Sequence, residues 1–276
     1  KLGMGFSLGN IGLVHAKKGD YDKALDYYNR SLKIREEIGD KLGMGFSLGN
    51  IGIVHSNKGD YDKALDYYER SLKIKEELGD KYGIGNNLNN IGIVYSDKGD
   101  YDKALDYQTR SLEIRERISH KQGMGLSFVA IGDNYYYRGE HDLALDSYEK
   151  SLKIFNKLDN PNGGSVSLHK IGIIYFHKSD YEQAEESLDK SLGIQKEIGL
   201  GAGDLLEPTT YLYLTYKHLG KDYDEKEIHT LIKESENIEF EVHYQLFKLF
   251  ENKSYLESAY NQVQEKASAM DVAAKF

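Results

Sequence analysis

The chain has 276 residues, of which 39% are hydrophobic, and its mean hydropathy is −0.61. It contains no cysteine, which excludes disulfides and thiolate metal sites. The formal net charge is −9 and most of the acidity lies in residues 201–276, so the sequence lacks the dense basic face of a nucleic-acid-binding protein. No apolar run approaches the length that spans a membrane.

A repeat of 40 residues organises the first 200 positions. Residues 1–40 and 41–80 differ at only six positions. Self-similarity at a fixed period is the signature of stacked structural repeats, and two prolines in the whole chain favour helix. The recurring small residues are Gly12, Gly52, Gly92, Gly132 and Gly172, and Ala24, Ala64, Ala104, Ala144 and Ala184.

Each repeat is predicted to be a helical hairpin. In residues 41–80, apolar side chains at helical spacing run up to Gly59, and a second helix is expected from Tyr61 to Gly79. Gly59 suits the left-handed end of a helix, and the short turns force neighbouring helices to be antiparallel. The aspartates expected to cap helix starts are Asp40, Asp60 and Asp80.

Gly52 and Ala64 are predicted to lie where the two helices of a hairpin meet. Their small size lets the backbones approach closely, which offsets the cost of about 0.5–1 kcal/mol for glycine in mid-helix. His15 and His55 share a slot with Tyr95 in the next repeat, so we assign both histidines to packing.

The recurring residues resemble the tetratricopeptide repeats. The pattern consists of Asn50-Ile51-Gly52, His55, Gly59-Asp60-Tyr61, Ala64, Tyr68 and Ser71. The 40-residue length and the glycine-rich junction at residues 79–85 are similar to the long repeats of Pins-type adaptors, kinesin light chains and prokaryotic signalling proteins. The resemblance implies an all-α fold, a right-handed α-solenoid of antiparallel helix hairpins whose first helices line a concave groove.

The resemblance covers five units in residues 1–200. We interpret residues 201–240 as a degenerate sixth unit and residues 241–276 as a C-terminal capping helix pair. Helices are expected at residues 204–218, 225–236, 238–251 and 254–270. Ser254 and Glu257 have the spacing of a capping box at the start of the last helix.

The first helix has apolar residues that no preceding unit covers. These are Leu2, Met4, Phe6 and Leu8, and we expect this N-terminal face to be exposed and able to self-associate. The chain begins in mid-pattern without a start methionine, which suggests a fragment of a longer array.

Alignment with the family places polar and aromatic residues in the groove. Asparagine amides can bond the backbone of an extended peptide, and aromatic rings can form pockets for its side chains. The candidate groove residues are Asn10, Asn50, Asn86, Asn89, Asn90, Asp133, Tyr136, His169, Lys170, Phe176, Tyr213 and Tyr216.

Two structural alternatives remain open for these residues. Asn10, Asn50 and Asn90 are copied by duplication and could simply bond adjacent helices. Tyr136, Phe176 and Tyr216 form a stripe for which packing between neighbouring helices is the stronger interpretation.

No constellation of catalytic residues emerges from the sequence. The nine histidines form no HExxH motif, no phosphate-binding loop is present, and we predict no enzyme activity, no cofactor and no metal. We expect a cytoplasmic, non-catalytic module that binds a peptide or helix of a partner protein, and neither nucleic acid nor membrane. The alternatives are a regulatory or sensor segment of a larger cyclase- or kinase-type signalling protein, and a self-assembling scaffold that forms homo-oligomers through the N-terminal face.

Overall fold

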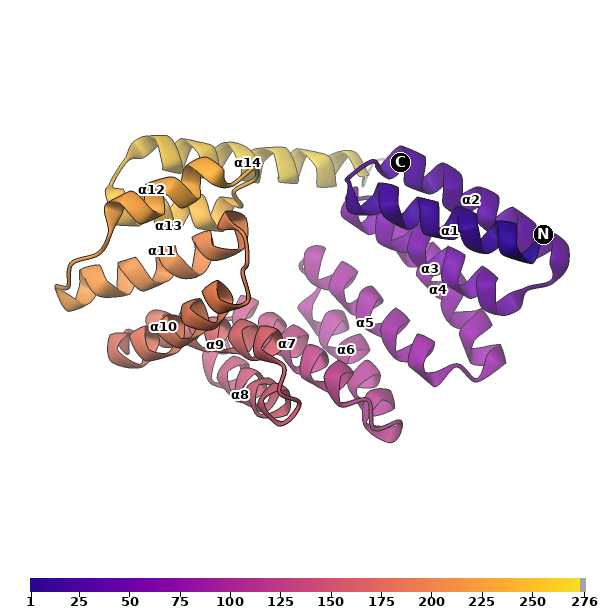
Figure 1. The fold of residues 1–276 in the computed structure, drawn as a ribbon, viewed down its shortest axis with the longest axis horizontal. Coiled ribbons are helices and arrows are strands. Elements are labelled where there is room, and N and C mark those ends of the chain that lie inside the picture. The colour runs from indigo at the N-terminus through magenta and orange to yellow at the C-terminus, as the bar shows by residue number, and fades with distance from the viewer. Residues whose placement is uncertain (274–276) are drawn as a thin grey trace. The chain divides into compact units, whose positions relative to one another are not determined.

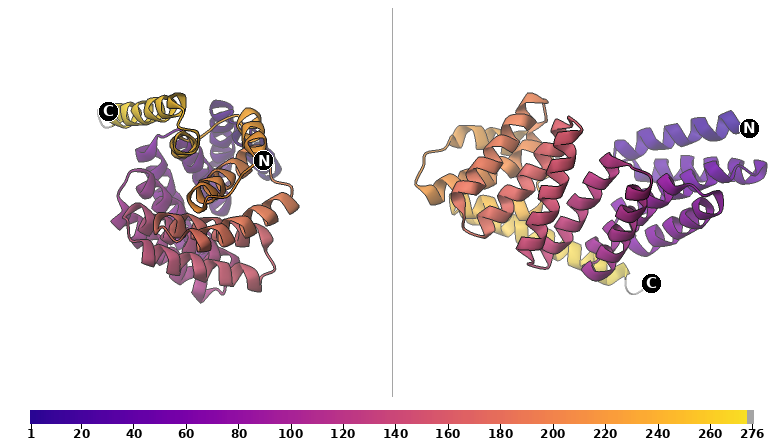
Figure 2. Two further views of the ribbon diagram at one scale, coloured as in Figure 1. Left: turned by 90° about the vertical axis from the view of Figure 1, so that its left-hand side faces the viewer. Right: turned by 90° about the horizontal axis from the view of Figure 1, so that it is seen from below.

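The computed structural model describes residues 1–273, which form fourteen α-helices and, in that range, no strand (Figure 1). The predicted all-α class of consecutive helix hairpins is confirmed. The helices form two compact parts, Lys1–Asn134 and Tyr135–Phe276. Within each part, most helices that follow one another in the chain pack side by side (Figure 2).

The first part consists of three complete hairpins and most of a seventh helix. We call the first helix of each hairpin an A helix and the second a B helix. The A helices are α1 (Leu2–Lys17), α3 (Lys41–Asn57), α5 (Lys81–Asp97) and α7 (Lys121–Tyr137), and the B helices are α2 (Tyr21–Ile38), α4 (Tyr61–Leu78) and α6 (Tyr101–Arg117).

The second part continues the alternation of A and B helices and ends on a long helix. Its helices are α8 (His141–Lys157), α9 (Pro161–His177), α10 (Tyr181–Glu197), α11 (Ala202–Leu219), α12 (Glu225–Glu234), α13 (Phe240–Phe250) and α14 (Lys253–Ala273). Helices α9, α10, α11, α12 and α13 share one apolar core, in which Leu188, Leu214 and Leu246 are almost fully buried. The division of residues 201–276 into a degenerate repeat and a cap stays a prediction.

The turns follow the sequence prediction except at one aspartate. Gly59 has φ 77°, the left-handed conformation expected of a helix end. Asp40 accepts a hydrogen bond from the Gly43 N–H at 3.0 Å. Asp60 does not cap its helix, because its carboxylate lies 3.1 Å from His55 Nδ1 instead.

The third repeat shows why Asp60 differs. There Tyr95 takes the place of His55, and the equivalent Asp100 accepts a hydrogen bond from the Lys103 N–H at 3.3 Å. A tyrosine ring offers this carboxylate no imidazole nitrogen, so the carboxylate turns to the free N–H of its own helix.

In the first hairpins the A and B helices cross closely, as predicted. The side chain that packs against the crossing glycine is a tyrosine, however, and not the predicted alanine. A Cβ on Gly52 would lie 2.8 Å from the Tyr68 ring, and Ala64 is fully buried nearby. Gly12 has the same relationship to Tyr28. The glycine therefore makes room for a tyrosine ring of the B helix.

Three predictions at the chain ends are wrong. Leu8 is only 8% exposed, whereas Leu2, Met4 and Phe6 are exposed as expected. Helix α14 begins before Ser254, and Asn252 Oδ1 accepts hydrogen bonds from both the N–H and the hydroxyl of Ser254, so the expected capping box does not form. Helix α12 ends at Glu234, two residues earlier than predicted.

Candidate functional site

Long side chains cross from each B helix of the first part into the next A helix. Arg35, near the end of α2, passes the backbone of Gly43 so closely that a Cβ on this glycine would overlap the guanidinium. The glycine at the third position of the repeat thus opens a passage for the residue at position 35. The equivalent pairs are Gly83 with Lys75 (2.7 Å from a Gly83 Cβ to Lys75 Cδ) and Gly123 with Arg115 (2.9 Å from a Gly123 Cβ to Arg115 Cδ).

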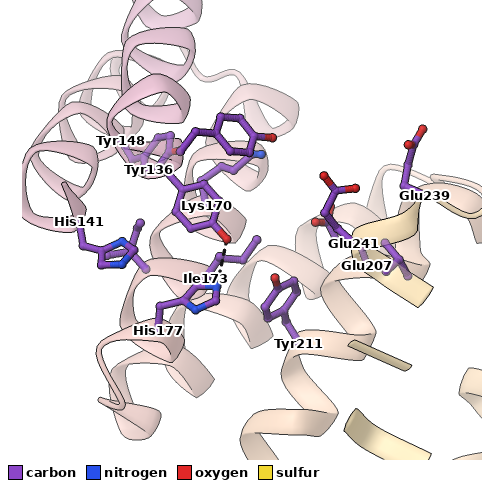
Figure 3. A pocket seen from close by; sticks show the side chains of 13 residues that line it. Tyr136, His141, Tyr148, Lys170, Ile173, His177, Glu207, Tyr211, Glu239 and Glu241 are labelled. Carbon is purple, nitrogen blue, oxygen red and sulfur yellow. Dashed lines mark hydrogen bonds between the residues drawn. The ribbon is translucent and has the colours of Figure 1, made fainter. Parts of the chain in front are cut away.

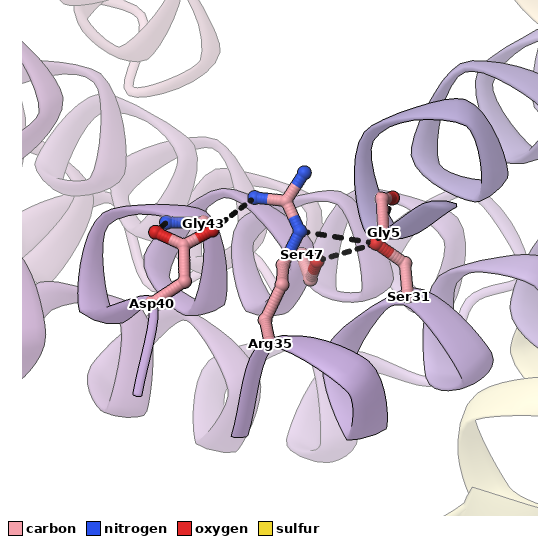
Figure 4. A network of polar contacts seen from close by, with 6 residues as sticks. All are labelled: Gly5, Ser31, Arg35, Asp40, Gly43 and Ser47. Carbon is pink, nitrogen blue, oxygen red and sulfur yellow. Dashed lines mark hydrogen bonds and ion pairs between the residues drawn. The ribbon is translucent and has the colours of Figure 1, made fainter. Parts of the chain in front are cut away.

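Arg35 ends in a polar network between α1 and α3 (Figure 4). Its Nε donates to Ser31 Oγ at 3.2 Å, and Ser31 Oγ donates to the Gly5 carbonyl at 2.7 Å and lies 3.3 Å from Ser47 Oγ. Its Nη1 lies 3.7 Å from Asp40 Oδ2, the carboxylate that caps α3. The guanidinium is therefore held by one carboxylate and by neutral groups.

Lys75 makes the corresponding crossing from α4 to α5. The residue is 6% exposed, and its Nζ donates to Asn87 Oδ1 at 2.8 Å and lies 3.5 Å from the Gly83 carbonyl. Burial lowers the pKa of Lys75, and Asp80 opposes this shift. The ammonium also lies 5.8 Å from the centre of the Phe46 ring on α3.

Arg115 is the most deeply buried of the three cations, at 4% exposure. Its Nη1 donates to Ser127 Oγ at 2.7 Å and to the Gly123 carbonyl at 2.9 Å. Its guanidinium also donates to the side-chain oxygens of Asn86 (3.1 Å) and Asn89 (3.4 Å), whereas its Nε is buried without a partner. The side chains of these two predicted groove residues on α5 are therefore held by hydrogen bonds from a buried guanidinium.

A cavity of about 770 Å³ lies between α1 and α3, above Arg35. Apolar side chains form most of its wall, and the predicted groove residues Asn10 and Asn50 lie in it. Asn10 is exposed and Asn50 is partly buried, so both amides are open to a ligand. The apolar wall residues are Leu2, Phe6, Leu13, Leu42 and Phe46.

A second cavity, of about 570 Å³, lies within the second part (Figure 3). Helix α9 contributes the most lining residues, and most of the others come from the end of α7 and from α8, α11 and α13. Tyr136 Oη and His177 Nε2 are hydrogen-bonded at 3.0 Å, and the His177 ring stacks on His141 with centroids 5.9 Å apart. Burial and the neighbouring His141 lower the pKa of His177. The charged residues of the wall are Lys170, Glu207, Glu239 and Glu241.

The structure places four predicted groove residues in these two cavities, namely Asn10, Asn50, Tyr136 and Lys170. Three others are packed inside the second part, where His169 is 6%, Phe176 8% and Tyr213 5% exposed. The Phe176 ring makes an edge contact with Tyr211, in agreement with the packing interpretation.

The remaining predicted groove residues, Asn90, Asp133 and Tyr216, are partly buried. Tyr213 Oη donates to the Glu227 carboxylate, and Tyr216 stacks on Tyr213 with centroids 6.0 Å apart. Asn90 and Asp133 are partly buried and line neither cavity.

The residues at position 35 of the repeat were not among the predicted site residues. Arg35, Lys75 and Arg115 recur every 40 residues as long basic side chains, each followed eight residues later by glycine. That pairing is visible in the sequence, although its meaning depends on how consecutive hairpins pack. Glu239 and Glu241 were missed because they lie outside the repeats.

Metal ligation and membrane crossing find no support in the described residues. Within them, no group of three histidine or acidic side chains is arranged to hold a metal ion. None of the helices in residues 1–273 combines the length and apolar character that crossing a membrane demands.

Comparison with known proteins identifies the repeats. The tetratricopeptide repeat family model matches residues 4–77, 47–117, 83–157 and 124–197. No curated protein shows a significant match to the sequence.

Several solved structures share the fold at low sequence identity. A Rap protein complexed with Competence and Sporulation Factor is 16% identical with a TM-score of 0.74, and the alignment covers 99% of this chain and 76% of that one. A STAND protein with a tetratricopeptide repeat sensor from Pyrococcus horikoshii is 17% identical with a TM-score of 0.66, covering 94% and 38%. A putative kinesin light chain from Podosopora anserina is 14% identical with a TM-score of 0.57, covering 70% and 95%.

Proposed function

Since the chain belongs to the tetratricopeptide repeat family, we propose that it is a non-catalytic interaction module whose A helices bind an extended peptide or a helix of a partner protein. The observation that carries this proposal is the cavity between α1 and α3, which combines apolar walls with the open amides of Asn10 and Asn50. The second cavity offers Tyr136 and Lys170 on a separate set of helices.

The chemistry of the α1–α3 cavity suits a peptide. An asparagine side chain supplies a donor and an acceptor together, as the backbone of an extended peptide requires. The apolar wall residues can accept one or two side chains of the peptide and remove them from water. Sequence-independent backbone contacts and a side-chain pocket together would give both affinity and selectivity.

A second candidate function is a sensor segment of a larger signalling protein. It is supported by the structural similarity to the Rap protein that was solved with Competence and Sporulation Factor, and to the STAND protein with a tetratricopeptide repeat sensor. In this case the same face would bind a signal peptide, and the output would come from another domain. The two functions share one binding event and differ in its consequence.

Selection from a displayed library of random peptides tests the proposed binding. The whole chain is immobilised, and the bound peptides are measured again on Asn10→Ala/Asn50→Ala and on Tyr136→Ala. Peptides that lose affinity for either variant support the proposal. Asn29→Ala, at an exposed position of α2, is the control that should bind normally. Failure to select any peptide, or equal binding to all variants, would refute it.

A further inference from the structure

The A helices of the first part are almost free of acidic residues. Helices α1 and α3 contain no aspartate or glutamate, α5 contains only Asp97, its last residue, and α7 contains only Asp133. The other acidic residues of residues 1–117 lie on the B helices and in the turns. The A helices thus contribute few negative charges to this face, although Asp40 lines the α1–α3 cavity and the chain as a whole carries a net charge of −9.

Three cations lie directly beneath this face. Arg35 lines the α1–α3 cavity, Lys75 lies close to the Phe46 ring of its wall, and Arg115 holds Asn86 and Asn89 of α5. Within the described part of the chain, Lys75 and Arg115 hydrogen-bond only to neutral groups, and neither is ion-paired with a carboxylate. Asp80 lies near enough to Lys75 to oppose the pKa shift caused by burial, but within the described residues no carboxylate forms an ion pair with Lys75 or Arg115.

We propose that this row of cations makes the A-helix face of residues 1–134 selective for an acidic peptide, in which acidic side chains alternate with apolar ones. The inference rests on the proposed function and specifies its ligand. Apolar side chains of the peptide enter the α1–α3 cavity, and its carboxylates lie over Arg35, Lys75 and Arg115.

Burial strengthens the attraction that these cations exert. Two charges interact several times more strongly near the low-dielectric protein interior than in water, and salt screens a buried charge less than an exposed one. A cation that already lies beneath the surface is also fixed in place, so little side-chain entropy is lost when a carboxylate approaches. Asp40 partly compensates Arg35, and Asp80 partly compensates Lys75. An oxygen of each aspartate also accepts an N–H at the start of the next A helix.

The same geometry favours a peptide over a nucleic acid. A phosphate backbone needs a dense set of exposed cations along its path. Here one cation per repeat lies beneath the A-helix face, and Lys75 and Arg115 are only 6% and 4% exposed. The open groups of the face are the amides of Asn10 and Asn50 and the apolar wall, which match peptide backbone and side chains.

Fluorescence anisotropy with defined probes tests the selectivity. The probes are fluorescein-labelled dodecapeptides in which leucine alternates with glutamate, glutamine or lysine, together with a labelled oligothymidylate of similar length. We expect the glutamate peptide to bind about tenfold tighter than the glutamine peptide, and the lysine peptide to bind weakest. Added salt should reduce the advantage of the glutamate peptide.

A pair of triple variants tests the residues. Arg35→Met/Lys75→Met/Arg115→Met should bind the glutamate and glutamine peptides alike. Arg30→Gln/Arg70→Gln/Arg110→Gln removes the same charge from the same three helices, at exposed positions where each arginine pairs with an aspartate one turn earlier. This control should keep the preference. Circular dichroism shows whether each variant is folded, and if the methionine variant unfolds, the probe series on the unmodified chain decides alone.

Three results would overturn the inference. These are equal affinity for the glutamate and lysine peptides, the same loss of preference in the control variant, and oligothymidylate binding as tight as that of the glutamate peptide. If the library yields binders without an excess of acidic residues, the acidic selectivity fails and the proposed peptide binding stands. If neither the library nor the dodecapeptides bind, both proposals fail.

Discussion

The ring of Tyr68 lies against the backbone of Gly52, so close that a Cβ on Gly52 would be 2.8 Å from both Cδ1 and Cε1 of the ring. Tyr68 is 2% exposed, and burial raises the pKa of its phenol strongly. A glycine in mid-helix is unfavourable by itself, so its presence here is explained by the tyrosine that fills the space.

Substitution of Gly52 should therefore destabilise the protein although it improves helix propensity. We expect Gly52→Leu to lower the free energy of unfolding by about 1–3 kcal/mol, because the leucine side chain would overpack against Tyr68. Gly193→Ala is the control, because this exposed glycine inside α10 has no atom within 4 Å of an added Cβ and should gain about 0.5–1 kcal/mol. Urea unfolding measures both, and an unchanged stability of Gly52→Leu would contradict the crossing.

Lys75 and Asn87 offer a test of the buried cation itself. Lys75→Met removes a charge whose burial is unfavourable, but it leaves the Oδ1 of the 2% exposed Asn87 without its donor. We expect a net loss of about 1–3 kcal/mol in the free energy of unfolding, because an unsatisfied buried acceptor is costly.

The double variant Lys75→Met/Asn87→Ser separates the two effects. Serine occupies the equivalent position in four other repeats, at Ser7, Ser47, Ser127 and Ser167. The serine hydroxyl can bond the backbone of its own helix, so we expect the double variant to recover most of the lost stability. Equal stability of the single and double variants would show that the hydrogen bond to Asn87 is not the cause.

The sequence predicts the hairpins well because the repeat fixes them locally. Gly59 at the turn, Asp40 before α3 and Gly52 in the crossing all act on residues that are close in the hairpin, so period and residue type suffice. Most of the candidate site depends on contacts between residues that lie far apart in the sequence. Arg115 meets Asn86 and Asn89 only because two consecutive hairpins pack against each other, and no local residue pattern determines that register.

The predicted groove shows the same limit. Asn10 and Asn50 occupy equivalent positions of nearly identical repeats and both line the α1–α3 cavity, and their role in binding stays a prediction. Phe176 and Tyr213 occupy the aligned positions but are buried, since both belong to the apolar core that α9 to α13 share. Family alignment alone therefore overestimates the groove in the second part.

His55 provides a prediction about the helix cap. His55→Tyr should preserve the ring contact, because Tyr95 stacks on Tyr107 at 5.5 Å as His55 stacks on Tyr67 at 5.4 Å. The carboxylate of Asp60 would then be free to accept an N–H of α4, as Asp100 does in α6. We expect stability to be unchanged or raised by up to about 1 kcal/mol. In thermal unfolding, a lower Tm for His55→Tyr than for the unmodified chain would contradict this account.

His177 provides the prediction about pH. Its pKa is lowered from 6.5 because burial, His141 and Lys248 all disfavour the charged imidazole. The folded state thus binds this proton less readily than the unfolded state, so the contribution of His177 is fully present above pH 6.5 and is lost as the pH falls through the lower folded pKa. His177→Gln should therefore lose less stability than the unmodified chain between about pH 7 and pH 5. Urea unfolding at both values measures the difference, with the exposed His229→Gln as control, and an identical loss in His177→Gln and the unmodified chain would refute it.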